Sequence, residues 1–120
     1  MNQKRIIMLV IVLFLLSVIT AGAEEKFGVK VYSGAKYDAA VSKNVSETIS
    51  ITAACYRTND SVAKVAEFYK KQPGMKYTGG EKVSAGFSNG VVDVTIQNPW
   101  MHMKTGKMMT DTLITIVKQE

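Results

Sequence analysis

One stretch of the sequence decides the fold: residues 49–74, ISITAACYRTNDSVAKVAEFYKKQPG. Its first part, residues 49–56, alternates apolar and polar side chains, which is typical of a half-buried β-strand. Its second part, residues 62–71, repeats apolar side chains at helical spacing and places Tyr69 on the apolar stripe. Asp60 precedes this helix, so its carboxylate is predicted to cap the free N–H groups. The stretch predicts a strand followed by an amphipathic helix.

Three further strands are predicted downstream. Residues 83–87 and 92–97 alternate in the same way, and the Asn89-Gly90 pair between them is typical of a tight hairpin turn. Residues 112–118 are rich in β-branched side chains and apolar on both faces, as expected of a strand covered on both sides. We therefore expect an α+β fold, in which one main helix packs on an antiparallel sheet of about four strands.

The segment before residue 49 is less regular. Residues 29–32 fit a short strand, and Ser33-Gly34 fits a turn. Residues 38–48 repeat apolar side chains about every four positions, but interspersed Ser, Asn and Thr residues weaken the helical pattern. The expectation is a short N-terminal segment that is either helical or irregular.

Residues 1–23 are predicted to be a signal peptide. Lys4 and Arg5 precede an apolar run at residues 6–19, and Ala21-Gly22-Ala23 supplies small residues for cleavage. The alternative is an uncleaved membrane helix, but the run is shorter than the roughly 20 residues that span a bilayer. We expect one small domain at residues 24–120, exported to the bacterial periplasm and touching the membrane only during export.

The composition excludes several classes of function. The 120 residues include one Cys and one His, which rules out an internal disulfide framework and a multi-cysteine zinc site. The formal charge is +5, but the basic residues are scattered and form no stripe that would follow phosphates. The sequence therefore predicts neither a nucleic-acid partner nor a cofactor.

No residue set fits an active site, so we do not expect an enzyme. Cys55 and His102 are the one possible cysteine–histidine pair, but Cys55 falls on an apolar strand face and is predicted to be a buried thiol. A hydrolase in which His102 serves Ser46, Ser50 or Ser84 has no motif behind it, and the acidic residues are dispersed.

The segment after residue 99 holds an unusual group of soft metal ligands. Thioethers and imidazole suit Cu(I) or Ag(I), and the face of Trp100 attracts cations. By residue type the group resembles the sites of periplasmic copper and silver chaperones, without their sequence frame or barrel fold. Strand alternation separates Met101 and Met103 from Trp100 and His102, so one ion needs a bend to reach them all. The candidate metal ligands are Met101, His102, Met103, Met108 and Met109.

A structural interpretation of the same segment competes with the metal site. Met is a common filler of gaps at the end of a core. Lys104 and Lys107 also place positive charge beside any bound cation. The sequence favours a loop whose Trp and Met side chains cover the core.

Three short motifs resemble a pattern of small exported bacterial envelope domains. They are YSGA at residues 32–35, YRTNDS at residues 56–61 and VAEFY at residues 65–69. Those domains carry a Tyr-Pro-Gly-Ala turn, a Thr-x-Asp-Ser helix cap and a helix with Val and Phe-Tyr; here Ser33 stands where Pro is usual. The resemblance implies an α+β domain of unknown function in the bacterial envelope, and it carries over no catalytic or binding residue.

The sequence therefore predicts an exported, non-catalytic binding or interaction module. Its partner would be a protein or another component of the envelope. The alternative is soft-metal binding through the segment 100–109.

Overall fold

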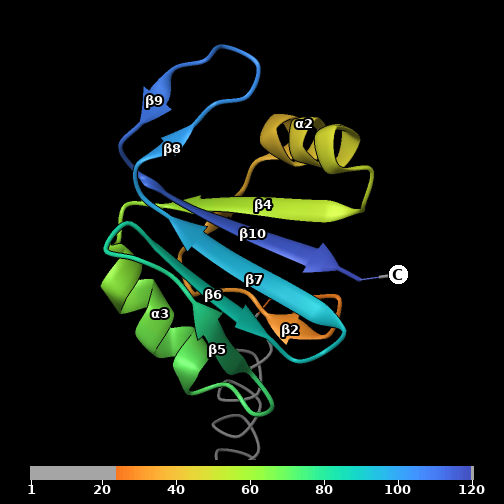
Figure 1. Ribbon diagram of the computed structural model, residues 1–120, viewed down its shortest axis with the longest axis vertical. Coiled ribbons are helices and arrows are strands. Elements are labelled where there is room, and N and C mark those ends of the chain that lie inside the picture. The colour runs from red at the N-terminus through yellow and green to blue at the C-terminus, as the bar shows by residue number, and fades with distance from the viewer. Residues whose placement is uncertain (1–23, 120) are drawn as a thin grey trace, which may run out of the picture.

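The computed structural model describes residues 24–119, so the predicted signal peptide, residues 1–23, lies outside the described residues. Six strands form one antiparallel sheet in the order β3-β4-β10-β7-β6-β5 (Figure 1). In that order their bounds are Lys36–Tyr37, Ala53–Thr58, Thr112–Lys118, Val92–Gln97, Ser84–Ser88 and Lys76–Gly79.

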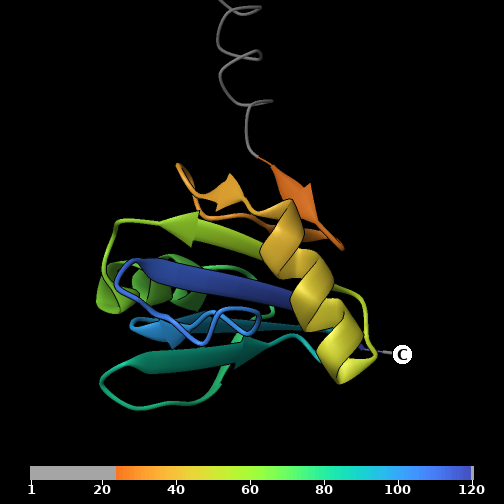
Figure 2. The same ribbon diagram turned by 90° about the horizontal axis from the view of Figure 1, so that it is seen from above.

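Two helices lie on opposite sides of this sheet, α2 (Ala39–Ile49) and α3 (Val62–Lys70) (Figure 2). Two short ladders stand apart from it. One pairs β1 (Glu25–Lys26) with β2 (Val29–Lys30), and the other pairs β8 (Trp100–Met101) with β9 (Met108–Met109). Neither helix within residues 24–119 is both long and apolar enough to cross a membrane.

The α+β class is confirmed, but the expectation of about four strands is wrong. The sheet has six strands because β3 and β5, which span two and four residues, close its two ends. The hairpin at residues 83–97 is confirmed as β6 and β7, and Asn89 Oδ1 accepts hydrogen bonds from the N–H groups of Val91 and Val92. The last strand lies between β4 and β7, as its apolar faces predict.

The larger core lies between the sheet and α3. Val65 and Tyr69 on α3 are fully buried, as the apolar stripe predicts. The buried sheet residues of this cluster alternate along their strands, so their side chains share one face. They are Ala54, Tyr56, Ala85, Phe87, Val92, Val94, Ile96, Ile114 and Ile116.

The N-terminal segment, for which the sequence predicts either a helical or an irregular structure, is helical, and its serines have a structural role. Asp38 caps α2 by accepting a hydrogen bond from the Val41 N–H at 3.0 Å. Ser42 Oγ accepts from the N–H of Cys55 at 2.7 Å, and Ser46 Oγ accepts from the N–H of Ala53 at 2.9 Å. These hydroxyls satisfy the part of β4 that β3 does not reach. The residues that weaken the helical pattern therefore attach the helix to the sheet.

The strand predicted at residues 49–56 begins later than expected. Ile49 is the last residue of α2, Ser50 ends the helix at φ 57°, and β4 starts at Ala53. Ile49 is 40% exposed, so it does not belong to the buried face of a strand. The apolar residues before Ala53 belong to the end of a helix and to a turn. Periodicity does not reveal this, because in a short apolar run the repeat of a helix cannot be told from that of a strand.

Asp60 does not cap α3, contrary to the sequence prediction. The N-cap is Ser61, which accepts a hydrogen bond from the N–H of Lys64 at 3.2 Å. The Asp60 carboxylate instead accepts a hydrogen bond from the Tyr32 hydroxyl at 2.5 Å. Asp60 therefore ties the segment before β3 to the start of α3.

We expect Ser61→Ala to lower the free energy of unfolding by about 1 kcal/mol, because it removes the cap of α3. Asp60→Ala should also destabilise, through the lost bond to Tyr32 rather than through the cap. Chemical denaturation of a double-mutant cycle with Tyr32→Phe measures this coupling. Losses that simply add would contradict the Tyr32–Asp60 bond, and an unchanged stability of Ser61→Ala would contradict the cap.

Stability should fall as the pH rises above about 10. The hydrogen bond to Asp60, together with burial, raises the pKa of Tyr32 from 10.0 to about 12. Between these values the unfolded chain releases the tyrosine proton while the folded chain keeps it, so alkali favours unfolding. Urea denaturation at pH 9 and pH 11 should show a smaller loss for Tyr32→Phe than for the wild type. Burial also raises the pKa of Tyr56 to about 12, so some loss should persist in the variant, and equal losses would contradict the shift at Tyr32.

Candidate functional site

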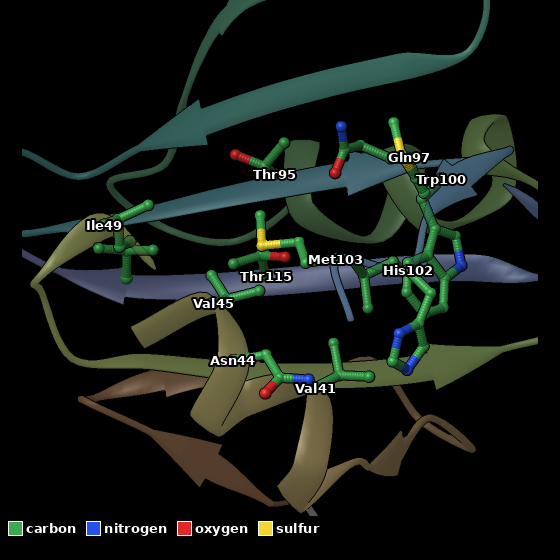
Figure 3. Close-up of a pocket in the computed structure, with 13 residues that line it drawn as sticks. Val41, Asn44, Val45, Ile49, Thr95, Gln97, Trp100, His102, Met103 and Thr115 are labelled. Carbon is green, nitrogen blue, oxygen red and sulfur yellow. The ribbon is translucent and has the colours of Figure 1, made fainter. Parts of the chain in front are cut away.

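A groove of about 430 Å³ opens on the face of the sheet that carries α2 (Figure 3). One wall is α2, the other is the β8–β9 hairpin, and β7 and β10 form the floor between them. The lining residues are mostly apolar and come from all of these elements. They are Val41, Asn44, Val45, Ile49, Thr95, Gln97, Trp100, Met101, His102, Met103, Leu113, Thr115 and Val117.

The groove exists because α2 covers only part of this face. Val41 and Val45 pack over Ala53, Cys55 and Leu113, on β4 and β10. The helix does not extend over β7. Thr95 is therefore exposed although β7 lies inside the sheet. The alternation at residues 92–97 predicts that the polar side chains face away from the core. In the structure, that polar face forms half of the groove floor.

Trp100 fixes the hairpin wall in place. Its ring is buried in the smaller core, and its Nε1 donates a hydrogen bond to Asp111 Oδ1 at 3.0 Å. The guanidinium of Arg57 lies 5.1 Å from the ring centroid, which is cation–π geometry. The imidazole of His102 stacks against the Trp100 ring, with centroids 6.0 Å apart and planes at 29°. These contacts together fix the position of the hairpin wall.

Arg57 connects the two walls of the groove. Its Nε donates to Asp111 Oδ2 at 2.7 Å, and its Nη1 donates to Asp38 Oδ2 at 3.3 Å. The bond to Asp111 raises the pKa of the guanidinium, so Arg57 stays protonated. Since Asp38 caps α2 and Asp111 holds Trp100, one Arg couples the position of the helix to that of the hairpin. Sequence reasoning missed this network because its members are far apart in the chain.

The structure divides the predicted metal ligands into two groups. Met101, His102 and Met103 line the groove together with Trp100, whereas Met108 and Met109 do not. The chain turns directly after His102: the His102 N–H donates to the Lys107 carbonyl, and the Gly106 N–H donates to the His102 carbonyl, each at 2.8 Å. This turn is the bend that one metal ion would need in order to reach side chains that strand alternation places on opposite faces.

Residues 24–119 contain no cluster of three or more His, Cys, Asp or Glu side chains able to hold a metal ion. A metal site in this part of the chain would therefore depend on the thioethers. Met101 and Met103 are 59% and 54% exposed, so much of each residue is open to solvent. Met109 is instead partly buried against the smaller core, which matches the predicted role of Met as core cover.

Cys55 is a structural thiol, as the sequence predicts. It is fully buried, its Sγ lies 3.7 Å from Thr115 Oγ1, and burial raises the pKa of its thiol. Ser46 is occupied by its bonds to Ala53 of β4, as described above. His102 lines the groove without either of them, so the arrangement offers no cysteine–histidine or serine–histidine pair there.

Two groove residues have side-chain amides that the sequence does not single out. Asn44 on α2 and Gln97 on β7 lie on opposite sides of the groove, with Thr115 and Met103 between them (Figure 3). Both are half-buried. In the sequence Asn44 only weakens a helix and Gln97 only ends a strand. Their opposition depends on how α2 crosses the sheet, which no local pattern encodes.

Comparison of this chain with protein family models, with curated proteins and with solved structures found no match. The resemblance of residues 32–35, 56–61 and 65–69 to exported envelope domains therefore stays a prediction.

Proposed function

We propose that this protein is an exported, non-catalytic binding module whose ligand site is the groove between α2 and the β8–β9 hairpin. The observation that carries the proposal is the mainly apolar groove of about 430 Å³, a volume within the range of ligand pockets. Its apolar walls and few polar groups match the usual composition of such sites. Export and a periplasmic location are supported by the signal-peptide pattern at residues 1–23 and by the envelope-domain resemblance.

An uncharged fluorescent probe, N-phenyl-1-naphthylamine, tests the groove. It should bind with saturation and quench Trp100, which is the single Trp of the chain. Thr95→Tyr places a ring on the exposed groove floor and should weaken binding at least tenfold. Thr78→Tyr, at an exposed strand position outside the groove, is the matched control and should bind as the wild type does. Absence of saturable binding, or equal loss in both variants, would contradict the groove as the ligand site.

Processing tests the export part of the proposal separately. Protein purified from its host should begin at Glu24, because cleavage is predicted after Ala23. N-terminal sequencing of the purified protein reads this directly. A membrane-bound form that keeps Met1 would contradict export as a cleaved protein.

Soft-metal binding is the second candidate function. The observation that favours it is the shared position of Met101, His102 and Met103 on one wall of the groove, beside the ring of Trp100. Thioether and imidazole ligands select Cu(I) or Ag(I). Lys104 and Lys107 lie exposed at the tip of the same hairpin and oppose a bound cation, so we expect an affinity no tighter than micromolar.

An anaerobic Cu(I) competition titration with Trp100 fluorescence as the readout decides this candidate. Quenching at one equivalent that is abolished by Met101→Leu with Met103→Leu would establish the site. The matched control is Met108→Leu with Met109→Leu, whose side chains do not line the groove. Quenching that is lost equally in both double variants would place the metal elsewhere on the hairpin.

A further inference from the structure

The lining of the groove contains no carboxylate, ammonium or guanidinium group. None of its thirteen residues is Asp, Glu, Lys or Arg. A ligand with a carboxylate or phosphate inside the groove would lose its hydration without gaining an ionic partner, which is costly. The part of the ligand that the groove encloses is therefore uncharged.

The polar groups of the groove are suited to a backbone rather than to a hydrocarbon chain. Asn44 and Gln97 oppose each other across the floor (Figure 3). The side-chain bond that reaches Asn44, from Thr48 Oγ1, goes to its backbone carbonyl and leaves its amide available. A primary amide presents an acceptor beside two donors, which matches the alternating C=O and N–H groups of an extended peptide. An acyl chain has nothing to offer these amides.

The hairpin wall is suited to side chains of varying shape. Met101 and Met103 are more than half exposed, and thioether side chains are flexible and polarisable, which is why Met recurs on surfaces that bind varied apolar partners. The half-buried imidazole of His102, which stacks on the buried ring of Trp100, adds a flat surface for an aromatic or aliphatic side chain. On the facing wall, Ile49 is partly exposed at the end of α2.

We propose that the groove binds an extended, uncharged peptide segment of another protein. The backbone of that segment hydrogen-bonds to Asn44 and Gln97, and its apolar side chains pack against α2 and the hairpin. This inference rests on the proposed function, because it names the occupant of the same groove. It places the protein among those that bind exposed apolar segments of other chains.

The probes are two capped peptides, N-acetylated and C-amidated, with the sequences Ala-Leu-Phe-Leu-Ala and Ala-Leu-Met-Leu-Ala. Each is compared with a form methylated at its backbone nitrogens and with decyl maltoside, an uncharged amphiphile without amides. Binding is measured by Trp100 fluorescence, and the bound residues are located by amide chemical shifts in NMR spectra. We expect both peptides to bind and to shift signals from α2 and β7, and N-methylation to weaken binding at least fivefold.

Two isosteric variants separate the amides from the shape of the groove. Gln97→Met and Asn44→Leu should each weaken peptide binding about fivefold, which corresponds to the loss of one net hydrogen bond. Binding of N-phenyl-1-naphthylamine should change less than twofold in both. Gln119→Met, outside the groove, is the matched control and should leave every probe unaffected.

The outcomes distinguish this inference from the proposed function. Naphthylamine binding without peptide binding, or equal binding of the methylated peptides, would overturn the peptide inference and leave the groove as a ligand site. Tighter binding of decyl maltoside than of either peptide would also overturn it, in favour of an aliphatic amphiphile. Failure of the naphthylamine as well would overturn both.

Discussion

Replacing Tyr69 by alanine should lower the free energy of unfolding by about 4 kcal/mol, in the range of other large-to-small core changes. The side chain is fully buried, and its ring packs edge-on against Phe68 with centroids 5.0 Å apart. Its hydroxyl also accepts a hydrogen bond from the N–H of Tyr32 at 3.2 Å. The truncation therefore leaves a large cavity under α3 and an unpaired backbone group.

Urea denaturation measures the effect of Tyr69→Ala. Tyr69→Phe separates the two contributions, since it keeps the ring and removes only the acceptor of Tyr32, and should cost about 1 kcal/mol. Tyr77→Ala is the matched control, because Tyr77 is 61% exposed and its loss should have little effect. A loss below about 2 kcal/mol for Tyr69→Ala would mean that α3 does not hold the core as described.

The second large effect is expected at Asp111. Asp111→Ala should cost about 3 kcal/mol, because it removes the acceptor of both Arg57 Nε and Trp100 Nε1. Hydrogen bonds to charged groups contribute more than neutral ones, and this carboxylate is partly buried. The variant should also release Trp100, so that the hairpin wall of the groove loses its fixed position.

Two measurements on Asp111→Ala follow from this role. Urea denaturation gives the stability, and the indole N–H signal of Trp100 in NMR spectra reports the lost bond to Asp111. Asp93→Ala is the matched control, since Asp93 Oδ2 accepts only an exposed bond from Gln119 and its loss should cost at most about 0.5 kcal/mol. An unchanged indole signal in Asp111→Ala would contradict the proposed anchoring.

The part of the fold that the sequence predicts is the part with strong local patterns. Residues 112–118 are correctly placed because β-branched side chains on both faces indicate an interior strand, and residues 83–97 because Asn89 marks the hairpin turn. The strands β3 and β5 are missed because short terminal strands carry too few residues for alternation to be visible. Asp60 is misassigned because the neighbouring Ser61 is an equally good cap. The Asp60 carboxylate bonds instead to the hydroxyl of Tyr32, which is distant in the sequence, and Ser61 caps the helix.

Only part of the candidate site could be predicted from the sequence. The segment from Trp100 to Met103 stands out by its residue types, and all four of these residues line the groove. Asn44 and Gln97 carry no such signal, because an amide on a helix or at a strand end is ordinary. Their relation depends on tertiary structure: α2 lies across β4 and leaves β7 uncovered.

The two serine hydroxyls that α2 offers to β4 have a consequence for how the molecule behaves in a crowded compartment. An unpaired strand at the border of a sheet is a template onto which a second chain can add, and such additions lead to aggregation. Ser42 and Ser46 occupy the N–H groups of Cys55 and Ala53 that would otherwise start this pairing. The helix thereby occupies this part of β4, so the serines that weaken its helical pattern leave two fewer free N–H groups for a second chain to pair with.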